Sequence, residues 1–330
     1  MIEIADITEL GEKLLSMNPD LVPRYRILRD ILHVLPQDSR FVAAKQAIGK
    51  SKWVELLREE QRPDGSWGRF HTEDTKRKQR IYTTQYAINR GIELGLDRRD
   101  SLMIAAIHYM EDVLADRRRW SDPYEKNVWF APGVKIFTAA VLTTIDPENP
   151  QIAGVWESMS EIYRRTLQSG VYSISEERSA SLEILGVDIS ESYISISSAP
   201  NLELIGSFSQ SFPIEMQQAL FQSIWDEHVR PFYLRPRPSS FPDSITARDF
   251  VWWLHTIKVM TRISTPPSIA ESIIDWFWKN RRSDGLWDGP RQLGRNAEFP
   301  LSESWRRTGS RSVDYSTQIA SLISRLVKAA

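Results

Sequence analysis

The chain contains no cysteine among its 330 residues. This absence excludes disulfide bonds, thiolate nucleophiles, and zinc or iron–sulfur sites that use cysteine ligands. It is also typical of proteins from a reducing compartment. A surplus of positive charge is missing as well, because 42 Lys and Arg stand against 43 Asp and Glu. Without that surplus we expect no nucleic-acid partner.

A long hydrophobic run is also lacking. The longest apolar stretch, residues 128–145, contains Lys135 and a Pro-Gly pair, and it is shorter than the ~20 apolar residues that cross a bilayer. The first nine residues include three acidic side chains where a signal peptide would be positively charged. The sequence therefore predicts a cytoplasmic protein with no membrane span, and it leaves the oligomeric state open.

What the sequence does contain is the apolar spacing of amphipathic helices, with hydrophobic residues at i, i+3, i+4 and i+7. The predicted helices cover residues 25–35, 53–61, 81–94, 101–114, 134–145, 152–167, 214–229, 246–263, 269–278 and 315–327. Residues 192–198 alternate between polar and apolar, and residues 170–175 do so faintly, which predicts at most a minor β-hairpin. No flexible linker divides the chain. We therefore predict one all-α domain, residues 1–330, with ten to twelve helices.

Two segments far apart in the chain match each other, residues 56–67 (LLREEQRPDGSW) and 276–287 (WFWKNRRSDGLW). Each combines a helix end with Asp-Gly-x-Trp. A glycine just past a helix can take the left-handed conformation, and the tryptophan can then pack back over the helix end. Similar helix starts follow, YTTQYA at residues 82–87 and YSTQIA at 315–320. A third, weak copy covers residues 167–172. Repeats near both ends of the chain favour a series of helical hairpins that forms a closed ring.

The first copy, with Gln61, Gly65 and Trp67, resembles the QW motif (Gln-x3-Gly-x-Trp) of the squalene and oxidosqualene cyclases and their prenyltransferase-like relatives. The second copy departs from it at Arg281, where that motif has glutamine. The resemblance implies an α/α toroid, a barrel of about six helical hairpins with about 55 residues each. It says much less about activity.

The catalytic residues of that family are missing. No Asp-x-Asp-Asp occurs, the motif with which class II cyclases protonate an alkene. No Asp-rich helix has the spacing that holds magnesium on a diphosphate, and the cysteine of a prenyltransferase zinc site is absent. The five histidines lack metal-ligand spacing. We therefore expect no metal and no cofactor.

Two segments carry candidate acid/base residues. The loop after the first QW-like turn contains His71, Glu73 and Asp74, which could transfer protons. The alternative is a solvated loop in which Asp74 caps a helix. Residues 120–129 (WSDPYEKNVW) place Asp122 and Glu125 between two tryptophans, a mix that suits an aromatic-lined cavity. The alternative there is a packed loop between helices.

Aromatic and basic residues supply the expected substrate contacts. These contacts are Tyr82, Trp120, Trp129, Trp305 and Arg306. The C-terminal loop that holds the last two also carries Arg291 and Arg295, and arginines at a barrel mouth can bind a phosphate or carboxylate. The remaining helical tryptophans, Trp252, Trp253, Trp276 and Trp278, are expected in the core.

These features predict a terpenoid cyclase-like enzyme. It would act on a small apolar, isoprenoid-derived molecule in a central aromatic-lined cavity by acid/base chemistry. One alternative is a non-catalytic toroid that binds a ligand or peptide. A second is a carbohydrate-active α/α toroid, since glycosidases also combine carboxylates with stacking aromatics.

Overall fold

The structure, a computed structural model, describes residues 2–293 and 298–329. Within these residues the chain forms 14 α-helices and no strand, so the all-α prediction is confirmed. The helices are α1 Ile4–Ser16, α2 Leu21–Arg26, α3 Ser39–Ile48, α4 Lys52–Glu60, α5 Thr84–Leu94, α6 Ser101–Leu114, α7 Phe130–Ile145, α8 Ala153–Leu167, α9 Ile174–Leu185, α10 Ala199–Ser207, α11 Ile214–Trp225, α12 Phe250–Met260, α13 Pro267–Lys279 and α14 Ser310–Ala329. A π-helical turn, η1 Ile27–Ile31, continues α2, and two 3-10 turns are η2 Pro150–Ile152 and η3 Ser209–Ser211.

Four of these helices, α1, α3, α9 and α10, were not predicted from the sequence. The predicted bounds of α6, in contrast, agree with the structure at both ends. Helix α9 is only weakly amphipathic, because Leu182 is exposed and few of its side chains are buried. Its packing against α8 therefore stabilises a helix that the residue pattern does not mark.

The alternating segment at residues 192–198 forms a series of turns rather than a strand. The Ser192 hydroxyl donates to the carbonyl of Ile189, and the Asn201 amide donates to the carbonyls of Ile194 and Ser195. These local side-chain bonds satisfy the backbone in place of a sheet partner. Residues 170–175, the expected second strand, run into the start of α9.

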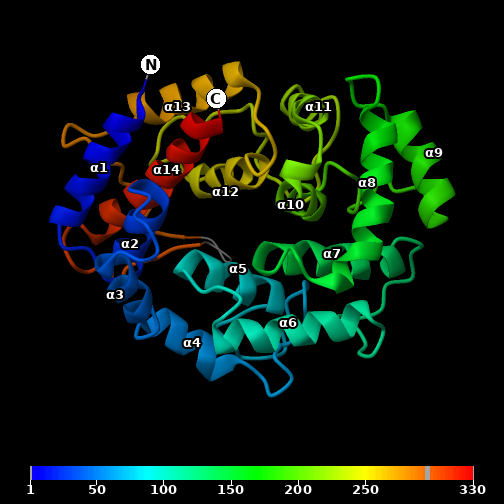
Figure 1. The fold of residues 1–330 in the computed structure, drawn as a ribbon, viewed down its shortest axis with the longest axis horizontal. Coiled ribbons are helices and arrows are strands. Elements are labelled where there is room, and N and C mark those ends of the chain that lie inside the picture. The colour runs from blue at the N-terminus through cyan, green and yellow to red at the C-terminus, as the bar shows by residue number, and fades with distance from the viewer. Residues whose placement is uncertain (1, 294–297, 330) are drawn as a thin grey trace.

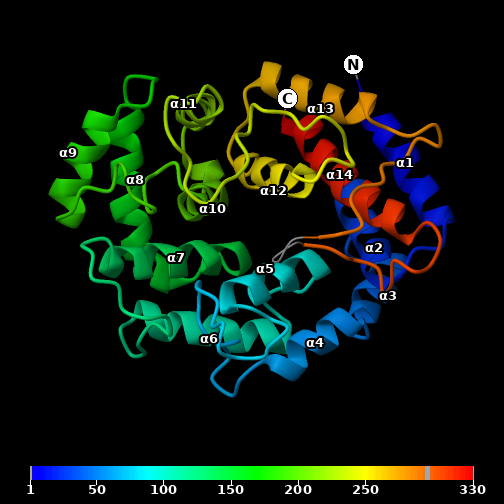
Figure 2. The ribbon, with the colours of Figure 1, turned by 180° about the vertical axis from the view of Figure 1, so that it is seen from behind.

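The helices follow one another once around the molecule, and the first and last of them, α1 and α14, pack together (Figure 1). Helices α5, α7, α10, α12 and α14 lie nearer the middle, and α4, α6, α8, α11 and α13 lie farther out, as both views show (Figures 1 and 2). Along the inner set, α5 contacts α7, α7 contacts α10, and α10 contacts α12. Residues from distant parts of the chain therefore meet in the middle.

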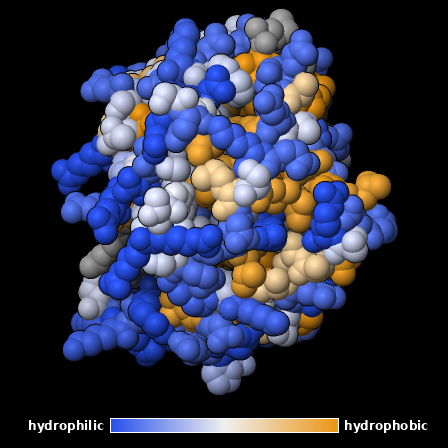
Figure 3. Space-filling view, turned by 90° about the vertical axis from the view of Figure 1, so that its left-hand side faces the viewer, coloured by the Kyte–Doolittle hydropathy of each residue, from blue (hydrophilic) through white to orange (hydrophobic). Residues whose placement is uncertain are grey.

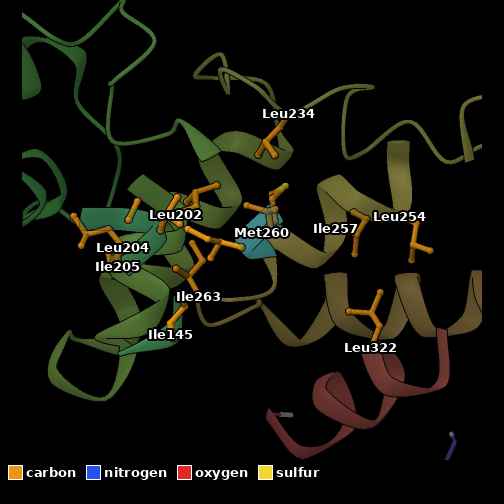
Figure 4. Close-up of a cluster of buried hydrophobic side chains, with 14 of the residues drawn as sticks. Ile145, Leu202, Leu204, Ile205, Leu234, Leu254, Ile257, Met260, Ile263 and Leu322 are labelled. Carbon is orange, nitrogen blue, oxygen red and sulfur yellow. The ribbon is translucent and has the colours of Figure 1, made fainter. Parts of the chain in front are cut away.

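Buried hydrophobic side chains form the core between the helices. In Figure 4, Leu202 of α10 lies beside Met260 of α12, and Leu322 of α14 points toward Ile257 of α12. The side of the molecule formed by the N-terminal helices is mostly polar, with hydrophobic areas between the charged ones (Figure 3). Among the described residues, no helix is both long and apolar enough to cross a membrane.

The two QW-like segments have the same three-dimensional structure. Gly65 and Gly285 have φ values of 86° and 76°, the left-handed conformation expected for them. The Trp67 indole donates to the carbonyl of Leu57 at 2.7 Å, and the Trp287 indole donates to the carbonyl of Phe277 at 2.8 Å. Both tryptophans thus bond the residue ten positions earlier.

In both copies a hydroxyl residue at the start of the following helix accepts a hydrogen bond from the tryptophan backbone. The two hydroxyl residues are not the ones that the sequence alignment pairs. The backbone N–H of Trp67 donates to the hydroxyl of Thr84, and that of Trp287 donates to the hydroxyl of Ser316. Thr84 therefore corresponds to Ser316 rather than to the next residue. The weak third copy differs, because the Tyr172 hydroxyl donates to the carboxylate of Glu177 instead of to a helix carbonyl.

Candidate functional site

A cavity of about 220 Å³ lies between α5 and α12. Loop residues Tyr233, Glu298 and Phe299 complete its wall. Its walls carry four aromatic side chains, Tyr86, Tyr233, Trp252 and Phe299. Its polar residues are His71, Thr83, Gln85, Asn89, Arg90, His255 and Glu298. The volume corresponds to about seven water molecules at ~30 Å³ each. The cavity therefore suits a small ligand with an apolar body and a few polar groups.

The main titratable pair in the cavity is His255 and Glu298. Nδ1 of His255 lies 3.1 Å from Oε1 of Glu298. Burial opposes charge on the imidazole, but the hydrogen bond to Glu298 prevails and raises the pKa of His255 above its usual value. Burial and the nearby Glu93 oppose ionisation of Glu298, yet Lys258 and His255 keep the pKa of Glu298 below its usual value. Each group therefore favours the charged form of the other.

Behind this pair, a network of charged residues and one glutamine joins four helices. Lys258 of α12 contacts both Glu298 and Glu93, and its Nζ lies 2.7 Å from Oε1 of Glu93 on α5. Arg26 of α2 lies 2.6 Å from Oε2 of Glu93, and the Gln318 amide of α14 donates to the same oxygen at 2.9 Å. Although burial opposes its charge, Lys258 and Arg26 hold the pKa of Glu93 well below its usual value. This network supports Glu298 from the side away from the cavity.

Arg90 of α5 also lines the cavity. Its guanidinium donates to the backbone carbonyls of Glu298 and Pro300, and only 5% of the residue is exposed. Burial lowers the pKa of Arg90 because no carboxylate bonds the guanidinium directly in the described part of the chain. The contact fixes the loop that carries Glu298 against α5.

His71, one of the expected acid/base residues, also lines the cavity. Its Nδ1 lies 2.7 Å from Oε1 of Gln85, and its ring meets Phe137 and Tyr233 edge-on, with centroids at 4.6 and 5.0 Å. His71 and Tyr233 also line a smaller hollow of about 40 Å³. They therefore stand at the junction of the two spaces.

Asp122 holds this loop in place. Its carboxylate oxygens accept the backbone N–H groups of Phe70, His71 and Thr72 at 2.5, 3.0 and 2.7 Å. Both oxygens are engaged by the backbone, so the residue positions His71 rather than facing a ligand as an open acid. Glu125 borders the smaller hollow, is exposed, and accepts from the Asn127 amide at 2.8 Å.

The other expected acids lie outside the cavity wall. Asp74 pairs with Arg77 at 3.4 Å and with Arg69 at 3.7 Å, and it accepts the backbone N–H of Lys76 within the loop. It caps no helix, since Thr83 is the N-cap of α5. The backbone carbonyl of Glu73 accepts from Arg69. The described residues that line the cavity do not include Glu73 or Asp74.

The five expected substrate contacts lie at separate places. Tyr82 packs against the cavity residue Tyr86, with ring centroids 5.8 Å apart, and Trp120 lines the smaller hollow. The Trp129 indole donates to the carbonyl of Asp188 at 2.7 Å. Trp305 and Arg306 border a different surface hollow of about 630 Å³ together with Arg291. Arg295, named with them, lies outside the described residues.

Sequence analysis missed His255, Glu298 and Lys258 as site residues. It also placed Trp252 in the core, which is wrong, because Trp252 is 44% exposed and lines the cavity, whereas Trp253 is fully buried. The sequence of α12 contains a pattern that could have identified two of these residues. Trp252, His255 and Lys258 recur at a spacing of three residues, so they share one face of an otherwise apolar helix.

Comparisons with protein-family models, with curated proteins and with solved structures find no match for this chain. The described residues also contain no group of three or more His, Asp or Glu side chains arranged to hold a metal ion. The function must therefore be argued from the cavity itself.

Proposed function

We propose that the chain is a terpenoid cyclase-like α/α toroid enzyme that transfers protons to and from a small, largely apolar molecule in the cavity between α5 and α12. The scaffold part of this proposal is supported by the equivalent turns at Trp67 and Trp287 and by the order of helices around the molecule. The substrate would be an isoprenoid-sized molecule that fits about 220 Å³, which is too little for a long polyisoprene chain.

The observation that carries the catalytic part is the His255–Glu298 pair in an aromatic-walled cavity. Because the carboxylate bonds Nδ1, it fixes the ring orientation and leaves Nε2 as the nitrogen that can exchange a proton with a ligand. An imidazolium is a much weaker acid than the protonated carboxyl that cyclases use on an alkene. We therefore propose a substrate with a polar proton acceptor, such as a carbonyl or hydroxyl, on its apolar body.

The test is incubation of the purified chain with isoprenoid alcohols, aldehydes and diphosphates in D2O. The readouts are product formation and deuterium incorporation by mass spectrometry. We expect turnover with a polar isoprenoid, and H255Q should reduce it at least ~100-fold, the usual contribution of a general acid. The matched control is H108Q, because His108 is exposed on α6. Absence of both turnover and binding across the panel would refute the proposal.

A non-catalytic binding toroid is the second candidate, and the position of Asp122 favours it. The carboxylate expected to act as an acid instead holds three backbone N–H groups. A pure binder would retain ligand affinity in H255Q and lose it in W252A. A carbohydrate-active toroid has less support, because glycosidases need two carboxylates flanking the bond. Among the described residues, Glu298 is the only acidic side chain that lines the cavity.

A further inference from the structure

Another hollow, of about 730 Å³, lies on the other side of the charged network. It is bordered by the π-helical turn η1, by α12 and by α14. Five cationic side chains line it, namely Arg26, Arg29, Lys258, Arg325 and Lys328, against the two carboxylates Asp30 and Glu93. We call this hollow the basic cleft. Its lining is far more positive than the chain as a whole, whose net charge is -1.

Ion pairs account for three of these five cations. Arg26 and Arg29 both bond the carboxylate of Asp30. Arg26 and Lys258 also share Glu93, and Lys258 reaches Glu298 in addition. These three cations therefore face three carboxylates, and the group is close to neutral. Arg325 and Lys328 form no ion pair with any described residue, so the excess charge of the basic cleft resides on them.

The position of Arg325 is fixed although it forms no direct ion pair with a described residue. Its Nη2 donates to the carbonyl of Lys258 at 3.2 Å and to the hydroxyl of Thr261 at 2.5 Å. The side chain is accessible, yet it is surrounded by protein inside the cleft. This desolvation and the neighbouring cation Arg262 outweigh the opposing effect of Glu93 and Asp30, and they lower the pKa of Arg325 to about 10. The guanidinium also keeps N–H donors that these two hydrogen bonds do not use.

Helix α14 presents these groups on one face. Ser321, Arg325 and Lys328 line the cleft at a spacing of four and three residues, which places their side chains above one another. On the adjoining turn, His33 contributes an imidazole whose Nε2 lies 2.9 Å from the Ser324 hydroxyl. A preformed row of donors with two cations that form no direct ion pair with a described residue matches a doubly charged anion. A monocarboxylate would neutralise only one of them.

We propose that the basic cleft binds a small phosphate-bearing anion through Arg325 and Lys328. The guanidinium would present its paired N–H groups to two phosphate oxygens, and the ammonium would contribute a point charge. The ion pairs of Lys258 with Glu93 and Glu298 lie between this cleft and the cavity that contains His255. The site is therefore distinct from the proposed active site and does not depend on the chemistry there.

Isothermal titration calorimetry of the intact chain at pH 7 and constant ionic strength tests this proposal. The probes are inorganic phosphate, diphosphate and glycerol 3-phosphate, with acetate and chloride as controls. We expect saturable binding of at least one phosphate compound, weakened at least ~10-fold in R325Q and several-fold in K328Q, and partly retained in R325K. Diphosphate bound more tightly than the monoester would indicate a free polyphosphate, and the reverse would indicate a phosphate ester.

The matched control is R58Q, because Arg58 is an exposed arginine on α4 that pairs with Glu55. It should bind like the parent chain. The proposal is overturned if no phosphate compound binds saturably, if acetate binds equally well, or if both R325Q and K328Q retain the parent affinity. Thermal unfolding, monitored by circular dichroism, reports whether each variant is folded. If R325Q does not fold, the phosphate affinity of K328Q, whose substitution lies at the accessible end of α14, tests the proposal alone.

Discussion

Lys258 on α12 and Glu93 on α5 form an ion pair of 2.7 Å across the middle of the molecule, although 165 residues separate them in the chain. Both side chains are mostly buried, with 14% and 16% exposed. Lys258 also contacts Glu298, so one ammonium group separates two carboxylates. The pair therefore links the proposed active site on one side with the basic cleft on the other.

Removal of the ammonium group should destabilise the fold. In K258M, Glu93 keeps Arg26 and Glu298 keeps His255, but the two carboxylates lose the cation between them. Breaking a buried ion pair on one side costs about 3 kcal/mol or more, so the free energy of unfolding in urea at pH 7 should fall by about that amount. R58Q, which breaks an exposed pair, should cost less than ~1 kcal/mol. An equal effect of the two variants would contradict this account.

The two left-handed glycines allow a matched comparison of backbone strain and steric collision. A Cβ at Gly65 would lie 2.1 Å from the carbonyl oxygen of Ala105, whereas one at Gly285 would meet nothing closer than the flexible end of Lys13 at 3.6 Å. Both variants carry the left-handed penalty of roughly 1–2 kcal/mol. G65A adds a collision with the backbone of α6. Urea unfolding should show G65A to be at least ~2 kcal/mol less stable than G285A. Similar values for both would mean that α6 can move away.

Local features of the fold could be predicted from the sequence because their causes are local. The apolar stripe of residues 101–114 defines α6, and Asp-Gly-x-Trp specifies a turn whose bonds run within one segment. Helix α10 was missed for a different reason. The helix carries the buried Asn201, whose hydrogen bonds to the carbonyls of residues 194 and 195 form only once the segment is packed.

The candidate site could not be predicted in the same way, because its members meet only after the chain has gone around the molecule. His255 and Glu298 are 43 residues apart, and Lys258 and Glu93 are farther apart still. Sequence proximity instead favoured the compact charged loop around Asp74, which pairs with its own neighbours. His71 was predicted as a site residue of this loop and lines the cavity, yet its position depends on Asp122, 51 residues away.

The two tryptophans of the repeated turns should contribute equally to stability. Trp67 and Trp287 are almost fully buried, and each donates to a helix carbonyl at nearly the same distance. W67F and W287F keep most of the apolar contact but leave the carbonyls of Leu57 and Phe277 without this donor. An unsatisfied buried group costs about 1–3 kcal/mol, and we expect both variants to lie in that range in urea unfolding. If only one position is sensitive, the turns are not equivalent energetically.

Glu177 should make stability fall as the pH rises toward neutrality. The residue is fully buried, where the Tyr172 hydroxyl donates to Oε2 at 2.5 Å and the backbone N–H of Ile196 donates to Oε1 at 2.8 Å. Burial outweighs these bonds and raises the pKa of Glu177 from 4.5 to about 7. Between pH 4.5 and 7 the unfolded chain therefore releases a proton that the folded chain retains.

The free energy of unfolding should accordingly decrease through this pH range, by on the order of 3 kcal/mol from this group, and then level off above pH 7. E177Q removes the titrating proton while keeping a carbonyl acceptor for Ile196. Urea unfolding from pH 4.5 to 8 should show a smaller decrease for E177Q than for the parent chain. E176Q, which changes the adjacent glutamate, is the matched control and should follow the parent curve. If E177Q follows the parent curve as well, Glu177 is ionised in the folded protein.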